Sequence, residues 1–254
     1  MIHVIKIGGG VIDDAEMLQR VLRACAVLQA PFILVHGGGR VATEIAHALN
    51  IPQAMVGGRR ITDADTLRIV TMTYAGLINK DIIARLQALS LDALGVCGAD
   101  MNLITAKRRE HPEVDFGFVG DVVSVNAQRL QEILHQGVSL VVAPITHDGK
   151  GQLLNTNADT VAAEIAKALA ASGAEPVELA YLFDLHGVLR DVDDISSVIP
   201  EIKADQVDEL VAEGILHAGM LPKITMAVDA ARAGIKVRIQ HAEDLGTQKG
   251  TVIQ

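Results

Sequence analysis

Two runs of three glycines lie near the start of the chain, and each could bind an anion through backbone N–H groups. Gly8–Gly10 follow the apolar segment Val4–Ile7, and Gly37–Gly39 follow Phe32–Val35 after one intervening residue, His36. Glycine lets a ligand approach the backbone closely, and the N–H groups that begin a following helix attract negative charge. Neither run completes a dinucleotide fingerprint or a P-loop. Together the two turns predict a phosphate site of another kind.

Two lysines lie where a cation is unusual. Lys6 is inside the first apolar segment, and burying its charge there is costly. An edge strand, from which the ammonium reaches water, is one explanation. At the carboxyl end of a parallel strand, Lys6 would instead point into the crevice where open α/β sheets bind ligands. Lys223 begins a predicted helix, where a cation opposes the helix dipole, and this indicates an anion nearby.

Two further segments carry side chains that suit a carboxylate or a phosphate. Arg59 and Arg60 precede a predicted helix; one suits the surface, and the other could bind a carboxylate with two hydrogen bonds. Asn155, Asn157 and Asp159 cluster where another helix begins. Capping of that helix explains one of these three polar side chains and leaves the other two for a ligand.

Alternating strands and helices must position these residues. The order strand, helix, strand, helix at the start predicts a parallel sheet covered on both faces. Strands are predicted at 4–7, 32–35, 93–97, 139–143, 178–183 and 237–240, and helices at 15–28, 41–49, 63–89, 126–135, 157–171, 204–213 and 222–233. The polar stretch 107–120 is predicted to form a hairpin or flap. Residues 172–176 are the predicted boundary between two lobes.

The composition narrows the class of protein. Half of the residues are hydrophobic and 2% are aromatic, which suits buried strands of Val, Ile and Leu under Ala-rich helices. The net charge of −9, with no dense basic block, argues against nucleic acid and anionic membranes as partners. No segment has the length of a membrane span. Cys25 and Cys97 show no metal or redox spacing, and so indicate buried thiols in a reducing cytoplasm.

Six motifs together resemble the amino acid kinase family over essentially the whole chain. They are Lys6-Ile-Gly-Gly9, His36-Gly-Gly-Gly39, Gly58-Arg-Arg60-Ile-Thr62, Asn155-Thr-Asn-Ala-Asp159, Asp184-Leu-His-Gly-Val188 and Gly219-Met-Leu-Pro-Lys223. The resemblance implies an α/β fold, a three-layer αβα sandwich with a mainly parallel central sheet. Residues 1–172 would be an N-terminal lobe for acyl amino acid binding and dimerisation, and residues 173–254 a C-terminal lobe for ATP.

The same resemblance implies a role for each motif. Lys6 and Lys223 would stabilise the transition state, Asp159 would hold both, and Gly9 and Gly38 would donate N–H groups to the moving phosphoryl. The acyl amino acid would be bound by Gly38, Gly39, Arg60 and Asn155. ATP would be bound by Asp184, Leu185, His186, Gly187, Val188, Leu189, Ile215, Leu216 and His217. Mg²⁺ would arrive on ATP, so no metal site of the protein's own is expected.

Within the family, the chain is most similar to members that phosphorylate the side-chain carboxylate of N-acetyl-L-glutamate in arginine biosynthesis. The segments 98–102 and 116–121 resemble a branch that includes N-succinylglutamate kinases, so N-succinyl-L-glutamate is the alternative substrate. Its second carboxylate would need a further cation, for which Arg59, Lys80 and Arg108 are the candidates. Phe183, where the family usually has Ser or Thr, and Leu185, in place of Val, depart from the pattern and bear on adenine binding.

Other readings remain at this point. Sister kinases of the same fold act on aspartate, glutamate, carbamate or uridylate. We expect no extra C-terminal regulatory domain here, which disfavours typical aspartokinases and many glutamate 5-kinases. A sensor without turnover would be expected to lose Lys6, Lys223 or Asp159, and a nicotinamide dehydrogenase is disfavoured by the incomplete fingerprints. Arginine-inhibited relatives carry a helix before the first strand, and here that strand begins at about His3. We therefore expect a cytoplasmic homodimer that does not respond to L-arginine.

Overall fold

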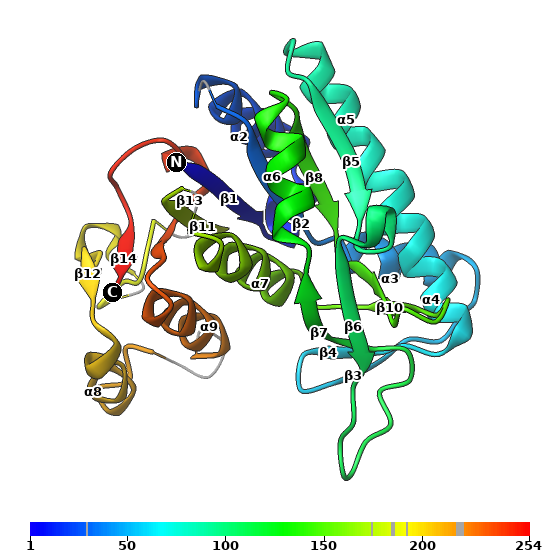
Figure 1. The fold of residues 1–254 in the computed structure, drawn as a ribbon. Coiled ribbons are helices and arrows are strands. Elements are labelled where there is room, and N and C mark those ends of the chain that lie inside the picture. The colour runs from blue at the N-terminus through cyan, green and yellow to red at the C-terminus, as the bar shows by residue number, and fades with distance from the viewer. Residues whose placement is uncertain (29, 174, 184–185, 192, 217–220) are drawn as a thin grey trace.

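The computed structural model describes residues 1–254 apart from 29, 174, 184–185, 192 and 217–220 (Figure 1). The strands of its central sheet are β1 (Ile2–Ile7), β2 (Phe32–His36), β5 (Ala93–Cys97), β8 (Ser139–Ala143), β11 (Val177–Phe183), β12 (Glu201–Ile202), β13 (Lys236–His241) and β14 (Thr251–Ile253). They lie in the order β12-β14-β13-β11-β1-β2-β8-β5. Each neighbouring pair is parallel except β13 and β14. The predicted mainly parallel sheet is confirmed.

Continuous apolar sequence explains why these strands are central. All five residues of β2 and all five of β8 are buried, which suits strands covered by helices on both faces. The sheet runs without a break from the N-terminal half to the C-terminal half, because β1 pairs with both β2 and β11. The carboxyl ends of β1 and β2 therefore lie side by side, and each leads into one of the two glycine turns.

Helices cover both faces of the sheet, and this confirms the three-layer αβα sandwich. One apolar core joins the sheet to α6 (Ala127–His135), α7 (Ala158–Ala171), α8 (Val207–Ala212) and α9 (Leu221–Arg232). A second core on the opposite face joins it to α1 (Gly9–Asp13), α2 (Ala15–Val27), α3 (Gly39–Ala48), α4 (Ala64–Thr71) and α5 (Asn79–Ala88). In the first of these cores, α7 packs across β1, β2 and β11 (Figure 1).

Smaller sheets surround the carboxyl end of the main one. The structure also has a hairpin of β3 (Ala54–Val56) and β4 (Arg59–Ile61), which was not predicted. Its strands have three residues each, too few to show an alternation of apolar and polar residues. The other sheet has β10 (Leu153–Asn155), β9 (Ile145–His147), β6 (Ile104–Arg108) and β7 (Gly120–Val125). The antiparallel pair β6–β7 and its projecting loop confirm the hairpin predicted at 107–120 (Figure 1). Short 3-10 turns lie at Asp100–Asn102, Ile195–Ser197, Ala204–Gln206 and Ala242–Asp244.

The long helix predicted at 63–89 is interrupted by a π-helical segment, Met72–Ile78, between α4 and α5. The wider turn brings Tyr74 and Ile78 against the second glycine turn. π-segments inside α-helices are often found at functional sites. Here the segment decides which side chains face the glycines.

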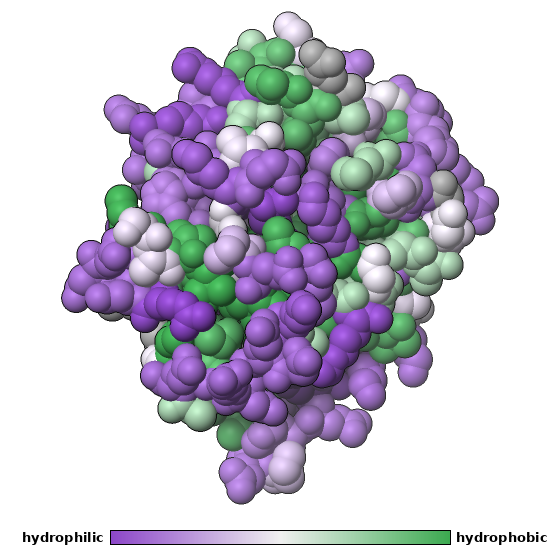
Figure 2. Space-filling view, turned by 90° about the vertical axis from the view of Figure 1, so that its left-hand side faces the viewer, coloured by the Kyte–Doolittle hydropathy of each residue, from purple (hydrophilic) through white to green (hydrophobic). Residues whose placement is uncertain are grey.

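The face of the molecule drawn in Figure 2 is mainly hydrophilic. Figure 2, which views the side of the molecule on the left of Figure 1, shows polar residues over most of that face and separate small apolar patches.

Cys25 is buried and Cys97 half-buried, and neither forms a disulfide. Burial raises the pKa of the Cys25 thiol to about 12, so it is an inert core residue. Among the described residues, no helix is long and apolar enough to cross a membrane.

Candidate active site

The two glycine turns begin two helices at neighbouring strand ends. Gly8 caps α1 and Gly38 caps α3, so the first N–H groups of both helices have no partner within their own helix. Gly38 has a φ of +143°, and a Cβ there would lie 2.2 Å from Ile78 Cδ1. Glycine is therefore required at this position by the backbone and by the π-helical segment together.

Lys6 is buried on a central strand and not on an edge. The residue is 6% exposed, and β1 has a strand on each side. Lys6 Nζ lies 2.6 Å from Asp159 Oδ1. This ion pair satisfies the ammonium in the crevice at the carboxyl end of β1, as the second explanation of Lys6 predicted.

The polar residues at the start of α7 perform three different tasks. Asn157 Oδ1 accepts a hydrogen bond from Thr160 N at 3.0 Å and caps the helix. Asp159, in the first helical turn, faces Lys6. Asn155 Nδ2, on β10, donates to Thr62 Oγ1 at 3.0 Å. Capping thus accounts for only one of the three side chains.

Lys223 lies in the first turn of α9, on the C-terminal side of the crevice. Its Nζ is 4.2 Å from the ring centroid of Phe183, and Lys6 Nζ is 5.3 Å from the same centroid. Two lysines from opposite ends of the chain therefore face a single aromatic ring. The sequence did not indicate that Phe183 would lie between them.

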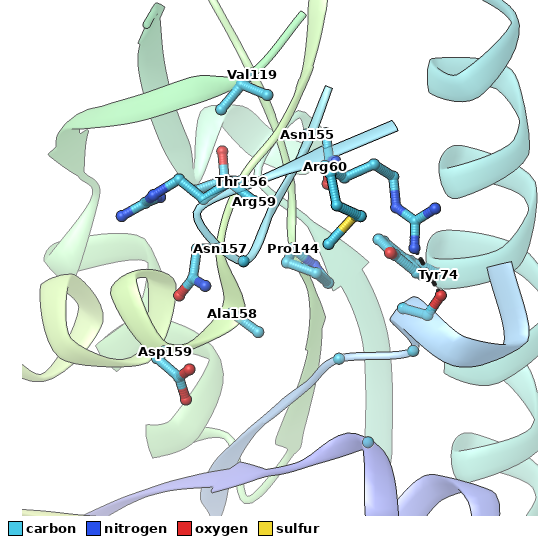
Figure 3. Close-up of a pocket in the computed structure, with 16 residues that line it drawn as sticks. Arg59, Arg60, Tyr74, Val119, Pro144, Asn155, Thr156, Asn157, Ala158 and Asp159 are labelled. Carbon is cyan, nitrogen blue, oxygen red and sulfur yellow. Dashed lines mark hydrogen bonds between the residues drawn. The ribbon is translucent and has the colours of Figure 1, made fainter. Parts of the chain in front are cut away.

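A cavity of about 240 Å³ opens beside the glycine turns (Figure 3). Six residues predicted from the sequence line it: Gly9, Gly38, Gly39, Arg60, Asn155 and Asp159. Tyr74, Thr156 and Met55 also line it and were not predicted. Thr156 adjoins the predicted motif residues, whereas Tyr74 enters the cavity only because of the π-helical segment.

The two adjacent arginines point away from each other across this cavity (Figure 3). Arg60 is 9% exposed; it donates to Gly39 O at 2.7 Å, to Thr43 Oγ1 at 2.9 Å and to Gln53 Oε1. Arg59 is half-buried, and burial, followed by the charge of Arg109, lowers the pKa of its guanidinium. Arg60 is thus fixed in position by protein acceptors.

Of the three candidate cations for a second substrate carboxylate, Arg59 alone lines the cavity. Lys80 Nζ donates to Gly95 O and to Asn79 Oδ1, each at 3.0 Å. Arg108 pairs with Asp115 at 2.7 Å in the exposed hairpin. Lys80 and Arg108 therefore have partners elsewhere.

Of the predicted nucleotide residues that the structure describes, His186, Gly187, Val188 and Leu189 come after β11, and Ile215 and Leu216 come after α8. Val188, Leu189 and Leu216 are buried in the core, and Val188 N donates to Thr251 Oγ1 at 2.8 Å. Ile215 is half-buried against the same core. Gly187 has a φ of +149°, and a Cβ there would lie 2.7 Å from Thr251 Oγ1. Asp184, Leu185 and His217 lie outside the described residues.

His186 belongs to a small polar cluster beside these residues. Its Nδ1 is 2.7 Å from Asp244 Oδ2, and its ring stacks on that of His241 with centroids 4.5 Å apart. Within the described chain, these three side chains are the group whose ligand atoms lie close enough to hold a metal ion. The His186–Asp244 contact orients the imidazole at the edge of the predicted nucleotide site.

Comparison with known sequences identifies the family. Residues 1–241 match the amino acid kinase family. The chain belongs to the amino acid kinase family. It is 49% identical over 252 residues to acetylglutamate kinase of Bacteroides thetaiotaomicron, which covers 99% of this chain and 97% of that protein. It is 51% identical over 246 residues to acetylglutamate kinase of Cytophaga hutchinsonii, covering 96% and 92%.

Solved structures of other proteins have the same fold. Smu.665 from Streptococcus mutans aligns with a TM-score of 0.81 and 26% identity over 100% of this chain and 98% of that one. Giardia carbamate kinase aligns with a TM-score of 0.72 and 12% identity over 100% and 98%. N-acetylglutamate synthase from Neisseria gonorrhoeae aligns with a TM-score of 0.83 and 21% identity over 99% of this chain and 59% of that one. The last two likenesses concern the fold alone.

His36 supports the second glycine turn from within the core. It is fully buried; its Nδ1 lies 2.8 Å from Gly37 O, and its Nε2 lies 3.3 Å from Asn79 Nδ2. Because the Asn79 amide nitrogen can only donate, Nε2 accepts and Nδ1–H donates to Gly37 O. Burial lowers the pKa of His36 to about 4, so the imidazole is neutral at pH 7.

This burial predicts that acid destabilises the fold through His36. In the unfolded chain His36 has a pKa of 6.5, and in the folded chain a pKa of about 4. The contribution of neutral His36 to the free energy of unfolding is therefore fully present above about pH 6.5 and is lost as the pH drops toward 4. Between pH 7 and pH 5 the free energy of unfolding should fall by about 2 kcal/mol from this group. Urea titrations of wild type, His36→Gln and the exposed control His47→Gln measure it. A slope with pH that is the same in all three would contradict this role.

Proposed function

We propose that this chain is an ATP-dependent acetylglutamate kinase. It transfers the γ-phosphoryl of ATP to the side-chain carboxylate of N-acetyl-L-glutamate and yields N-acetyl-L-glutamyl 5-phosphate and ADP, the second step of arginine biosynthesis. One observation carries the proposal. Buried Lys6 pairs with Asp159, and Asp159 lines a cavity whose wall also includes both glycine turns, Arg60 and Asn155. The chain around it is 49% identical to an acetylglutamate kinase over nearly its whole length.

The residue types suit phosphoryl transfer to a carboxylate. A side-chain carboxylate is already ionised at neutral pH, so the reaction needs no general base. Catalysis then consists of holding two anions in line and stabilising charge on the phosphoryl oxygens. In this proposal Lys6 and Lys223 supply the positive charge, Asp159 orients them, and Gly9 and Gly38 donate N–H groups.

The substrate would lie in the cavity of Figure 3. We assign its α-carboxylate to Arg60, which is fixed by Gly39 O and Thr43 Oγ1, and its N-acyl amide to Asn155. Gly38 and Gly39 would bind the carboxylate that is phosphorylated. The rigid attachment of Arg60 supports this assignment, because a preordered guanidinium loses little freedom when it binds.

ATP would bind to the C-terminal lobe, residues 173–254, and the acyl amino acid to the N-terminal lobe, residues 1–172. The proposed nucleotide residues are Asp184, Leu185, His186, Gly187, Val188, Leu189, Ile215, Leu216 and His217. Mg²⁺ would neutralise the β and γ oxygens of ATP. The Asp159 carboxylate is paired with Lys6, and the cluster of His186, His241 and Asp244 offers mostly nitrogen ligands, so the residues fit Mg²⁺ held through the phosphates.

The substrate prediction is that the acyl group is acetyl. Free glutamate carries an α-ammonium that an amide-lined pocket would have to desolvate, so we expect an acylated substrate. The relatives at 49% and 51% identity are acetylglutamate kinases, which supports an acetyl rather than a succinyl group. The protein is incubated with Mg·ATP and hydroxylamine, which traps acyl phosphates, and with N-acetylglutamate, N-succinylglutamate, glutamate or aspartate. N-acetylglutamate should give the highest kcat/KM. A preference of more than tenfold for N-succinylglutamate would reverse the assignment and point to Arg59 in the cavity wall.

The lysine prediction separates catalysis from binding. If Lys6 and Lys223 act on charge that develops during transfer, Lys→Ala at either should lower kcat by roughly 10²–10³ and change KM far less. Lys150→Ala, on an exposed turn, is the matched control. Steady-state kinetics measure both constants. A Lys6→Ala enzyme with a kcat close to that of wild type would remove Lys6 from the reaction.

The arginine prediction tests the carboxylate contact. Arg60→Lys should raise KM for N-acetylglutamate about 10- to 100-fold, because an ammonium cannot bind the carboxylate and also donate to Gly39 O, Thr43 Oγ1 and Gln53 Oε1 as the guanidinium does. KM for ATP should stay nearly unchanged. The exposed Arg68→Lys on α4 is the control. An equal rise of KM for both substrates would show that Arg60 only supports the fold.

We also propose a cytoplasmic homodimer formed through the N-terminal lobe. In the described chain β5 is an edge strand of the central sheet, and Leu94 on it is 43% exposed. Met72 and Leu77, on the adjoining π-helical segment, are each 57% exposed. Apolar residues beside an open strand edge invite pairing with a second copy.

The assembly prediction is a dimer whose activity is indifferent to L-arginine. Leu94→Lys should shift sedimentation toward the monomer. The control Val27→Lys, at the end of α2, should not, because Val27 is 74% exposed. Assays at saturating L-arginine should match assays without it. A stable hexamer, or strong inhibition by arginine, would contradict the prediction.

A further inference from the structure

The ring of Phe183 lies at the meeting point of the two lysines. Lys223 Nζ on α9 is 4.2 Å from its centroid, and Lys6 Nζ on β1 is 5.3 Å from it. Both distances are within the range of about 6 Å over which an aromatic face attracts a cation. A Cβ added at Gly8 would lie 4.0 Å from both Lys6 Nζ and a ring carbon of Phe183. The ring, the two ammonium groups and the first glycine turn therefore share one small space.

Neighbouring groups fix the plane of this ring. Tyr181, two residues earlier on the same face of β11, stacks on it with centroids 6.2 Å apart and an interplanar angle of 7°. Tyr181 is itself 1% exposed, and its hydroxyl donates to Asp159 O at 3.3 Å. The stack is thus anchored to the first turn of α7, which also supplies the carboxylate that pairs with Lys6.

The charge around the ring explains what it could contribute. Two ammonium groups that converge on one site repel each other, and the Asp159 carboxylate pairs with Lys6. The negative face of a benzene ring attracts both cations without accepting their hydrogen bonds in the way a carboxylate does. Such an attraction is worth about a 2- to 30-fold factor, less than a charge-assisted bond to phosphate. The ring can therefore orient the lysines without competing with the phosphoryl group.

We propose that Phe183 is a positioning residue of the kinase, whose ring face holds Lys6 and Lys223 toward the moving phosphoryl group. The proposal rests on the function proposed above, in which these lysines stabilise the transition state. It assigns to Phe183, the position at which the motif departs from the usual Ser or Thr, a task at the reacting centre rather than at the adenine.

The test replaces Phe183 with 4-fluoro-, 3,5-difluoro- and 3,4,5-trifluorophenylalanine by site-specific incorporation. Fluorine leaves the shape of the ring nearly unchanged and progressively removes its negative face. The kcat for N-acetylglutamate should fall stepwise, by about 2- to 30-fold over the series, with KM for both substrates nearly constant. The same analogues at Phe32, a fully buried core residue of β2, should leave kcat unchanged. Equal kcat across the Phe183 series would overturn the proposal.

Two further measurements separate this proposal from the assignment of the substrate. Phe183→Tyr should retain most of the activity because it keeps the ring, whereas Phe183→Leu should lose as much as the trifluoro analogue. In the substrate-free protein, an NMR titration of ¹³C-labelled lysine should show the pKa of Lys223 falling along the fluorine series. This titration does not depend on which carboxylate is phosphorylated. A Lys223 pKa that is the same for all four rings would exclude the attraction, even if N-acetylglutamate is the substrate.

Discussion

The structure depends most on one ion pair, that of buried Lys6 with half-buried Asp159. An ammonium in the centre of a parallel sheet costs several kcal/mol to desolvate unless a partner compensates it closely. Asp159 does so at 2.6 Å, and this requires α7 to begin where its first turn faces the carboxyl end of β1. Asn157 fixes that beginning by capping the helix. The pair therefore couples a strand, a helix and the crevice between them.

A second constraint acts on the other side of the crevice. Gly38 leaves room for Ile78 and Tyr74, and the π-helical segment that carries them forms part of the cavity wall. Neutral His36 holds the same turn by donating to Gly37 O. Arg60 holds the next part of the turn by donating to Gly39 O at 2.7 Å. Positive charge is supplied by Lys6, Lys223, Arg59 and Arg60.

The sequence predicted the features that depend on local pattern. Continuous apolar runs indicated β1, β2 and β8, and polar residues at unusual positions indicated Lys6, Arg60 and Asp159. Other features depend on contacts that no local pattern encodes. The π-helical segment widens a helix whose periodicity looks ordinary, so Tyr74 could not be assigned to the cavity. In the sequence, Phe183 was only a departure from a motif. Its contacts with Lys6 and Lys223 could not be predicted, because these residues are far away from it in the chain. The hairpin that carries Arg59 and Arg60 was missed because its strands have three residues each.

A double-mutant cycle on Lys6 and Asp159 tests the central claim most directly. Urea unfolding is measured for wild type, Lys6→Met, Asp159→Asn and the double variant. Asp159→Asn leaves the buried Lys6 charge without its partner and should cost about 3–5 kcal/mol, and Lys6→Met, which leaves the half-buried Asp159 charge, should cost less. The double variant removes both charges and should be more stable than the sum of the single losses allows, with a coupling of about 2 kcal/mol or more. Additive losses would show that the two side chains contribute independently to the free energy of unfolding, and this would contradict the account.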